Sequence, residues 1–247
     1  MKQMWRRLVA AKIRMQGSLL ASLDIRGGEG LIQMAGRVGS GDTQNLEAQA
    51  ARRYWPLLMG KAFRRDADAP GANALLNYGY AIMRATCARA AVGAGLHPTI
   101  GIQHSNRGNA FALADDLVEP FRPIVDALVR RFVECGVDAL TPAVKRRFAR
   151  LIAVDLKVGD EVSPVSAAAQ RLARSLARGF ENGRPDLVVF EPRPGKHGAR
   201  LAHWPRWRTS HEQAAACNPE RVSSHVDIRH VRSAGHLQGG RAGCEPV

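Results

Sequence analysis

The sequence predicts an all-α fold, because apolar residues recur at the i, i+3, i+4 spacing of a helix in one segment after another. Short connections that contain glycine or proline separate these segments. In addition, Thr141-Pro142 and Ser163-Pro164 each place a capping residue before a proline that suits the first position of a helix. We therefore expect one multi-helix domain over residues 1–190.

The first half of this domain contains four expected segments. An amphipathic stripe begins at Trp5, and the third segment starts near Asp42 or Thr43, either of which can cap a helix. Pro56 ends or bends that segment, and a charged loop over 61–71 follows it. The expected segments lie over about residues 3–22, 31–38, 42–55 and 72–94.

The second half is also expected to be mainly helical. The apolar run from Asn109 to Glu119 forms one segment, and Pro120 marks a kink or a new helix that continues to Cys135. A run rich in valine and leucine, residues 186–190, is expected to form a short closing strand. Two further helices are expected over about residues 142–157 and 164–181.

Residues 191–247 differ in composition from the preceding domain. They contain six of the eight histidines, nine lysines and arginines against five aspartates and glutamates, and few aliphatic residues. No helical or strand period persists through them. We expect a poorly structured basic tail whose histidines lack the regular spacing of metal ligands.

The overall charge favours a polyanionic partner. The 247 residues include 36 Lys and Arg and 22 Asp and Glu, which gives a formal net charge of +14, and 45% of the residues are hydrophobic. Such an excess of basic residues favours nucleic acid, with an anionic membrane surface as the alternative. The four cysteines form no CxxC pair, which excludes zinc-knuckle spacing.

The sequence contains no segment that targets a membrane. No run approaches the roughly 18 apolar residues that a membrane-spanning helix needs. Lys12 and Arg14 interrupt the apolar residues near the N-terminus, so a signal peptide is not expected. We therefore expect a cytoplasmic protein without a membrane partner.

His104, Asp116 and Glu119 are the clearest candidates for a chemical site. On a helix, Asp116 and Glu119 share one face, and a short polar loop separates them from His104. Carboxylates beside buried apolar positions are costly unless a cation neutralises them. One imidazole with carboxylates and no thiol suits Mg²⁺ or Mn²⁺ better than structural zinc, and such an ion suits phosphodiester chemistry. A solvated acidic helix face is the alternative, and spacing does not identify a third carboxylate.

Four blocks of the sequence carry a resemblance to a known family. They occur in the family's order and together span about residues 3–190: MWRRLVAAKIRMQGSLL, NLEAQAARRYWPLLMG, LLNYGYAIMRATCARAAVGAGLHPTIGIQH and NAFALADDLVEPFRPIVDALVRR. The chain resembles the CRISPR-associated integrase, the first Cas protein, in its type II branch. The resemblance implies a metal-dependent DNA endonuclease and integrase that inserts short pieces of foreign DNA into a CRISPR array. It also implies a homodimer that acts on double-stranded DNA with a small ferredoxin-like partner, the second Cas protein.

The resemblance further implies roles for individual residues. The catalytic, metal-binding set falls on Glu47, His104 and Glu119, with Asp116 as a supporting acidic residue and Asp115 as a structural one. The terminal 3′-hydroxyl of the incoming DNA would attack a phosphodiester at the repeat boundary, with Mg²⁺ or Mn²⁺ lowering the charge barrier. Arginines would hold the DNA backbone, and the candidates are Arg6, Arg7, Arg53 and Arg122.

The chain departs from the family pattern in three respects. Family members carry an N-terminal β-rich domain that supports dimerisation, whereas this chain begins near the start of the helical domain. Gln103 and Ser105 flank His104 where relatives often carry bulkier or basic side chains. The tail over 191–247 resembles no part of the family. The alternative expectation is therefore a truncated, non-catalytic fragment that binds DNA.

Overall fold

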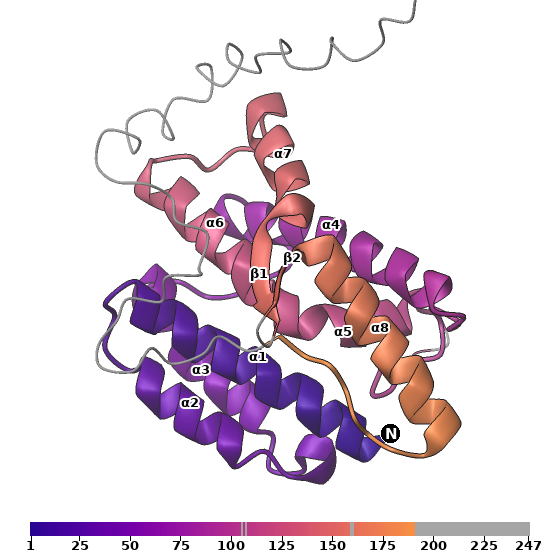
Figure 1. Ribbon diagram of the computed structural model, residues 1–247. Helices are drawn as coiled ribbons and strands as arrows, with labels where there is room; N and C mark the ends of the chain where they lie inside the picture. Colours follow the sequence, from indigo (N-terminus) through magenta and orange to yellow (C-terminus); the bar gives the residue numbers. More distant parts are fainter. Residues whose placement is uncertain (105, 107, 159–160, 191–247) are drawn as a thin grey trace, which may run out of the picture.

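The structure, a computed structural model, describes residues 1–104, 106, 108–158 and 161–190. Within these ranges most residues belong to helices, and the strands form a single two-stranded sheet (Figure 1). The all-α class predicted from the sequence is therefore confirmed. The tail expected over 191–247 lies outside the described residues, and so does the predicted division of the chain at residue 190.

The elements follow one another in the order that the helical periodicity predicts, with two departures that are treated below. The α-helices are α1 (Lys2–Ser22), α2 (Gly28–Gly36), α3 (Leu46–Met59), α4 (Ala72–Gly93), α5 (Ala112–Val118), α6 (Arg122–Glu134), α7 (Pro142–Ala149) and α8 (Val165–Asn182). Three 3₁₀ turns are η1 (Ser40–Asp42), η2 (Glu119–Phe121) and η3 (Arg150–Ala153), and the strands are β1 (Asp155–Val158) and β2 (Glu161–Pro164).

Helix α1 joins the two parts of the fold. On one side it packs against α2 and α3, and on the other against η2 and α6 (Figure 1). Because it has neighbours on both sides, most of its length is buried, including Leu8, Ile13 and Leu20. The α1–α2 contact brings backbone close to backbone: a Cβ atom added to Gly17 would lie 2.6 Å from the carbonyl oxygen of Gly28. The two glycines therefore allow the short α2 to lie directly on α1.

Helix α4 organises the other part of the fold. It packs against α5, α6, α7 and α8, as the small residues along its sequence allow. The buried side chains of Val125 on α6, Phe148 on α7 and Leu172 on α8 belong to the same apolar core. The ring of Phe148 lies 5.5 Å from that of Phe132, an edge-on arrangement typical of aromatic pairs.

The N-terminus of α3 differs from the expected capping pattern. The helix begins at Leu46 with Asn45 as its cap, so the expected cap at residue 42 or 43 was wrong by two or three residues. Asp42 still supports the helix, because its carboxylate accepts hydrogen bonds from the backbone N–H of Leu46 (2.9 Å) and of Glu47 (3.0 Å). Pro56 does not end the helix, which continues to Met59.

The chain bends where the sequence places Glu119-Pro120. Helix α5 starts at Ala112, three residues later than expected, and ends at Val118. The turn η2 then leads into α6 with its residues still in the helical region of backbone space. Proline in the first turn of a helix loses no needed hydrogen bond, and the expected break between two helices at this point is confirmed.

Two expectations for the end of the domain were wrong. Residues 186–190 form no strand; Leu187 and Phe190 are buried, and the Phe190 ring lies 4.6 Å from that of Phe121. The strands lie instead at 155–158 and 161–164, and their antiparallel register pairs Asp155 with Pro164. The helix expected over 142–157 therefore ends early, with α7 and η3.

Within the described ranges, no helix combines the length and the apolar composition needed to cross a membrane.

Candidate metal centre

Two of the expected metal ligands, Glu47 and Glu119, meet at the side chain of Lys12. The Nζ atom of Lys12 lies 2.6 Å from Oε1 of Glu47 and 2.5 Å from Oε2 of Glu119. The three residues come from α1, the first turn of α3 and η2, so three separate elements converge on one point. Glu119 is almost fully buried, whereas Glu47 keeps 26% of its side chain exposed. The glutamate pair therefore has one inner and one solvent-facing member.

Arg122 supports Glu119 from the opposite side. Its Nε atom donates a hydrogen bond of 2.9 Å to Oε1 of Glu119, three residues earlier in the chain. Its guanidinium also lies 4.6 Å from the centre of the Tyr80 ring, a distance typical of a cation–π contact. Arg122, predicted as a DNA contact, is thus engaged inside the protein.

The charges of this cluster are mutually stabilised. Burial alone would lower the pKa of Lys12, but the attraction of Glu119 and Glu47 raises it above its ordinary value. Burial alone would raise the pKa of Glu119, but Lys12 and Arg122 lower it below its ordinary value. At neutral pH the buried glutamate is therefore a carboxylate and the lysine an ammonium.

The donor chemistry of the glutamate pair fits a hard divalent cation. Two carboxylate oxygens from different elements approach a single positively charged atom, which is how oxygen ligands surround Mg²⁺ or Mn²⁺. Oε2 of Glu119 is buried, and it lies against the ammonium of Lys12. Lys12 thus stands where a cation would be held.

His104 does not join the two glutamates. In the part of the chain that the structure describes, no three His, Cys, Asp or Glu side chains form a group that could hold a metal ion. His104 instead contacts Asp116, with Nδ1 2.6 Å from Oδ1, and its ring meets the Trp5 ring edge-on at 6.1 Å. The His104 side chain is 44% exposed, and its second ring nitrogen is not used by Asp116.

Asp116 fixes the loop that carries His104. The carboxylate is fully buried and accepts hydrogen bonds from the backbone N–H groups of Ile102, Gln103 and His104. Burial raises the pKa of Asp116, and these hydrogen bonds oppose that rise. Both oxygens are therefore occupied by the loop. Asp115 lies elsewhere, where it accepts a hydrogen bond of 2.7 Å from the Asn109 side chain.

A buried polar network behind the glutamate pair was missed by the sequence reasoning. Asp126 on α6 accepts hydrogen bonds from the hydroxyls of Tyr54 (2.8 Å) and Tyr80, which lie on α3 and α4. Burial raises the pKa of Asp126 to about 6. Through Tyr80 this network reaches Arg122, and through Arg122 it reaches Glu119. The signal available in the sequence was a charged residue inside an apolar helical pattern.

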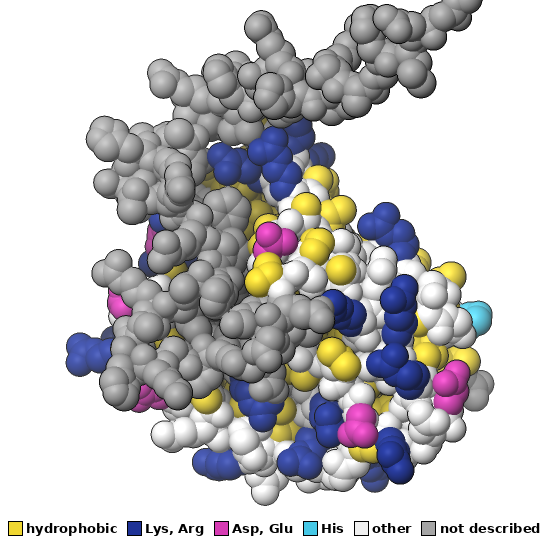
Figure 2. All heavy atoms as spheres, viewed as in Figure 1, with side chains coloured by type: hydrophobic (Ala, Val, Ile, Leu, Met, Phe, Trp, Pro, Cys, Tyr) yellow, Lys and Arg dark blue, Asp and Glu magenta, His cyan; other side chains and the backbone are white. Residues whose placement is uncertain are grey.

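Basic side chains are spread widely over the surface. The predicted DNA contacts Arg6, Arg7 and Arg53 are exposed on α1 and α3. Arg6 donates to the carbonyl oxygen of Val38, and Arg7 forms an exposed ion pair of 3.2 Å with Asp186. Figure 2 shows further lysine and arginine side chains over α7 and α8.

The fold and the site together define a class of protein. It is a mainly helical protein in which glutamates from separate elements converge on the buried ammonium of a lysine. The family model described as "CRISPR associated protein Cas1" matches residues 3–139. The CRISPR-associated endonuclease Cas1 of Neisseria meningitidis serogroup C is 35% identical over 187 residues, which cover 72% of this chain and 59% of the relative. The Cas1 endonuclease 2 of Pyrobaculum aerophilum is 32% identical over 148 residues, which cover 56% of this chain and 48% of that relative. The chain belongs to the Cas1 family, and it spans about half to three fifths of the length of these two relatives.

Solved structures show the same fold. A casposase bound to its integration product superposes with a TM-score of 0.64 at 22% identity, over 86% of this chain and 67% of that one. A Cas1 protein from Thermotoga maritima superposes with a TM-score of 0.61 at 17% identity, over 72% of this chain and 66% of that one. A chain of a Cas6-RT-Cas1–Cas2 complex gives a TM-score of 0.55 at 17% identity, over 75% of this chain and 25% of that one. At these identities the likeness concerns the fold alone.

Proposed function

We propose that this chain contains the catalytic helical domain of a metal-dependent DNA endonuclease and integrase that acts in spacer acquisition. The single observation that carries the proposal is the meeting of Glu47 and Glu119 around one cationic atom, 2.6 and 2.5 Å away. Membership of the Cas1 family supports it, since curated relatives are named endonucleases. The assignment to the type II branch rests on the sequence blocks.

In this proposal Glu47, His104 and Glu119 hold Mg²⁺ or Mn²⁺, which when bound would polarise the scissile phosphate and stabilise the leaving oxygen. Arg122 keeps Glu119 ionised and oriented. Asp116 orients the His104 ring and leaves its second nitrogen to act as a ligand, as carboxylates behind metal-binding histidines commonly do. In the structure His104 lies apart from the two glutamates, so binding the ion together with them requires the loop that Asp116 holds to move closer.

Double-stranded DNA is the proposed substrate, and its backbone is held by exposed arginines such as Arg7 and Arg53. The net charge of +14 supports this choice. A homodimer and a small ferredoxin-like second Cas protein are the proposed partners. A structurally similar chain belongs to a solved Cas6-RT-Cas1–Cas2 complex, which supports such a partner.

The decisive experiment measures nicking and strand transfer on duplex DNA in Mn²⁺, in Mg²⁺ and in EDTA. Glu47→Gln, Glu119→Gln and His104→Ala should each abolish the metal-dependent activity. Glu134→Gln is the matched control, because Glu134 pairs with arginines of its own helix, Arg130 and Arg131, and should leave activity intact. Equal activity in EDTA would contradict the proposal.

The second candidate is a non-catalytic DNA-binding fragment. It is favoured by one observation, that an ammonium already lies between the two glutamates. This candidate expects DNA binding that weakens steeply with salt and shows no metal-dependent turnover. In either case Arg7→Gln and Arg53→Gln should each reduce the slope of log affinity against log salt by about one for each phosphate that the variant no longer neutralises. Turnover, rather than binding, therefore separates the two candidates.

A further inference from the structure

The formal charges around the glutamate pair already balance without a metal ion. Lys12 and Arg122 carry two positive charges, and Glu47 and Glu119 carry two negative charges. Lys12 contacts both glutamates directly, and Arg122 contacts Glu119. The Lys12 side chain is 12% exposed and that of Glu119 is 5% exposed, so water screens this group weakly. A divalent cation added here would leave two uncompensated positive charges in a poorly solvated place.

A buried excess charge is unfavourable, so the same residues that form the site also oppose its loading. The strongest opposition comes from Lys12, because its Nζ atom contacts both carboxylates at once. A cation bound by the same two oxygens has to displace the ammonium from at least one of them. Arg122, in contrast, uses Oε1 of Glu119, while Lys12 uses Oε2. Only Lys12 therefore competes for the position itself.

Building on the proposed function, we propose that Lys12 couples metal binding to DNA binding. In the free protein Lys12 holds the glutamates together and keeps the affinity for the divalent cation low. When a DNA phosphate arrives, it supplies the missing negative charge and a new partner for the displaced ammonium. The site then accepts the cation readily. Because coupling between two binding sites is reciprocal, the cation raises the affinity for DNA by the same factor.

The proposal assigns Lys12 a function that a merely structural lysine would not have. A structural lysine would only stabilise the fold, and its loss would weaken metal binding along with everything else. A competing lysine gives the opposite sign, because its removal frees a cation position between two carboxylates. One unit of charge removed a few ångströms from a divalent cation should tighten metal binding at least about tenfold, even at an effective dielectric constant near 20.

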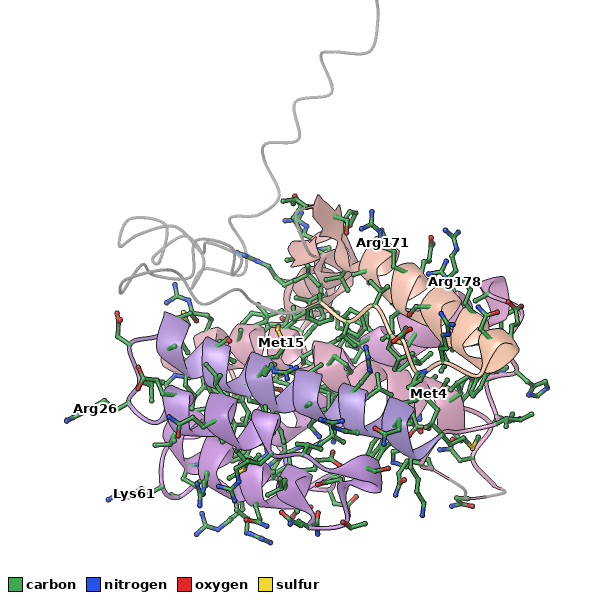
Figure 3. All side chains as sticks on the ribbon, turned by 60° about the horizontal axis from the view of Figure 1, so that its bottom comes forward. Met4, Met15, Arg26, Lys61, Arg171 and Arg178 are labelled. Atoms are coloured by element: carbon green, nitrogen blue, oxygen red, sulfur yellow. The ribbon has the colours of Figure 1, made fainter. Side chains whose placement is uncertain are left out.

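The test measures Mn²⁺ affinity of the DNA-free protein by the EPR signal of unbound Mn²⁺, and DNA affinity by fluorescence anisotropy with Mn²⁺ or EDTA at constant ionic strength. Lys12→Gln should bind Mn²⁺ about tenfold or more tightly than the wild type, and its DNA affinity should respond less to Mn²⁺. Lys61→Gln is the matched control, because Lys61 extends from a loop into solvent (Figure 3) and its loss changes the total charge equally.

A second measurement on the wild type covers the case in which Lys12→Gln does not fold. Reductive methylation of the native protein should modify Lys12 slowly in EDTA, because its ammonium is ion-paired with both glutamates. In saturating Mn²⁺ without DNA, the displaced amine has no new partner, so its methylation should rise while that of Lys61 stays unchanged. No rise would overturn the proposal.

The outcomes also separate this inference from the proposed function. If Glu47→Gln binds Mn²⁺ no less than the wild type, the metal site itself is contradicted. Glu47-dependent Mn²⁺ binding that is unchanged or weakened in folded Lys12→Gln would leave the metal site standing and overturn the role of Lys12.

Discussion

Asp116 positions the imidazole of His104, because Oδ1 of Asp116 lies 2.6 Å from Nδ1 of His104. The same carboxylate accepts hydrogen bonds from the backbone N–H groups of Ile102 and Gln103. One fully buried side chain on α5 thus sets both the path of the loop and the direction of the imidazole. The position of the histidine depends on a residue that need not contact substrate.

Asp116→Asn should lower metal-dependent nicking about 10- to 100-fold, as is usual when the partner of a metal-binding histidine is replaced. The amide cannot accept from several N–H groups and also bind Nδ1, so the ring loses its fixed orientation. Asp115→Asn is the control, since that side chain contacts Asn109 and Arg84 instead. Nicking assays on both folded variants check the prediction, and equal loss in the two would contradict it.

Gly101→Ala should reduce activity without touching a proposed ligand. A Cβ atom at this position would overlap the carbonyl oxygen of His104 and lie 3.0 Å from Oδ2 of Asp116, so the loop would have to move. Gly108→Ala, in the same loop, adds a Cβ 3.4 Å from Asn106 Oδ1 and should be tolerated. Activity and thermal unfolding of both variants provide the measurement. Full activity in Gly101→Ala would show that the loop position is unimportant.

Arg122→Gln should lower the free energy of unfolding by about 3 kcal/mol or more, because it removes one partner of a buried ion pair. The variant also loses the stacking of the guanidinium on the Tyr80 ring. Arg26→Gln should change stability by less than about 0.5 kcal/mol, since Arg26 points into solvent (Figure 3). Urea unfolding in EDTA gives both values. A small effect at Arg122 would mean that Lys12 alone neutralises Glu119.

Asp126 should make stability depend on pH. Burial raises its pKa from 3.8 to about 6, so between these values the folded protein binds the proton more tightly than the unfolded chain does. The contribution of Asp126 to the free energy of unfolding therefore falls as the pH rises through this range, by about 3 kcal/mol in total.

In the Asp126→Asn variant the side chain at this position is an amide, which does not titrate in this pH range. From about pH 3.5 to about pH 7, the wild type should lose about 3 kcal/mol of stability relative to this variant. Urea unfolding of both proteins at a series of pH values gives the difference directly. Two pH profiles that run parallel would contradict the raised pKa.

Helical periodicity was sufficient to predict α1, α4 and α6, because each buries a continuous apolar stripe, and the Ser163-Pro164 pair predicted α8. The strands over 155–158 and 161–164 escaped prediction because they are short and pair with each other. The apolar residues 186–190 reflected burial of Leu187 and Phe190 in a segment without regular structure.

For the candidate site, the sequence indicated His104, Asp116 and Glu119 by local spacing, but Glu47 came from the resemblance alone. The reason is that Glu47 is distant in sequence and reaches Glu119 only through tertiary packing. Lys12 was interpreted as an interruption of an apolar run, although a buried lysine requires partners. Asp126 was visible in the sequence only as a charged residue inside an apolar helical pattern. Its two tyrosine partners gave no local signal, since the hydrogen bonds join three separate helices.

The meeting of Lys12, Glu47 and Glu119 has a consequence for protein synthesis. A chain still on the ribosome exposes α1 and α3 long before η2 leaves the exit tunnel, since domains emerge from the N-terminal end. Until then Lys12 can pair with Glu47 but the second carboxylate is absent. A nascent or prematurely terminated chain therefore has no complete glutamate pair, and the proposed metal site can form only after synthesis has passed residue 119 and η2 has docked.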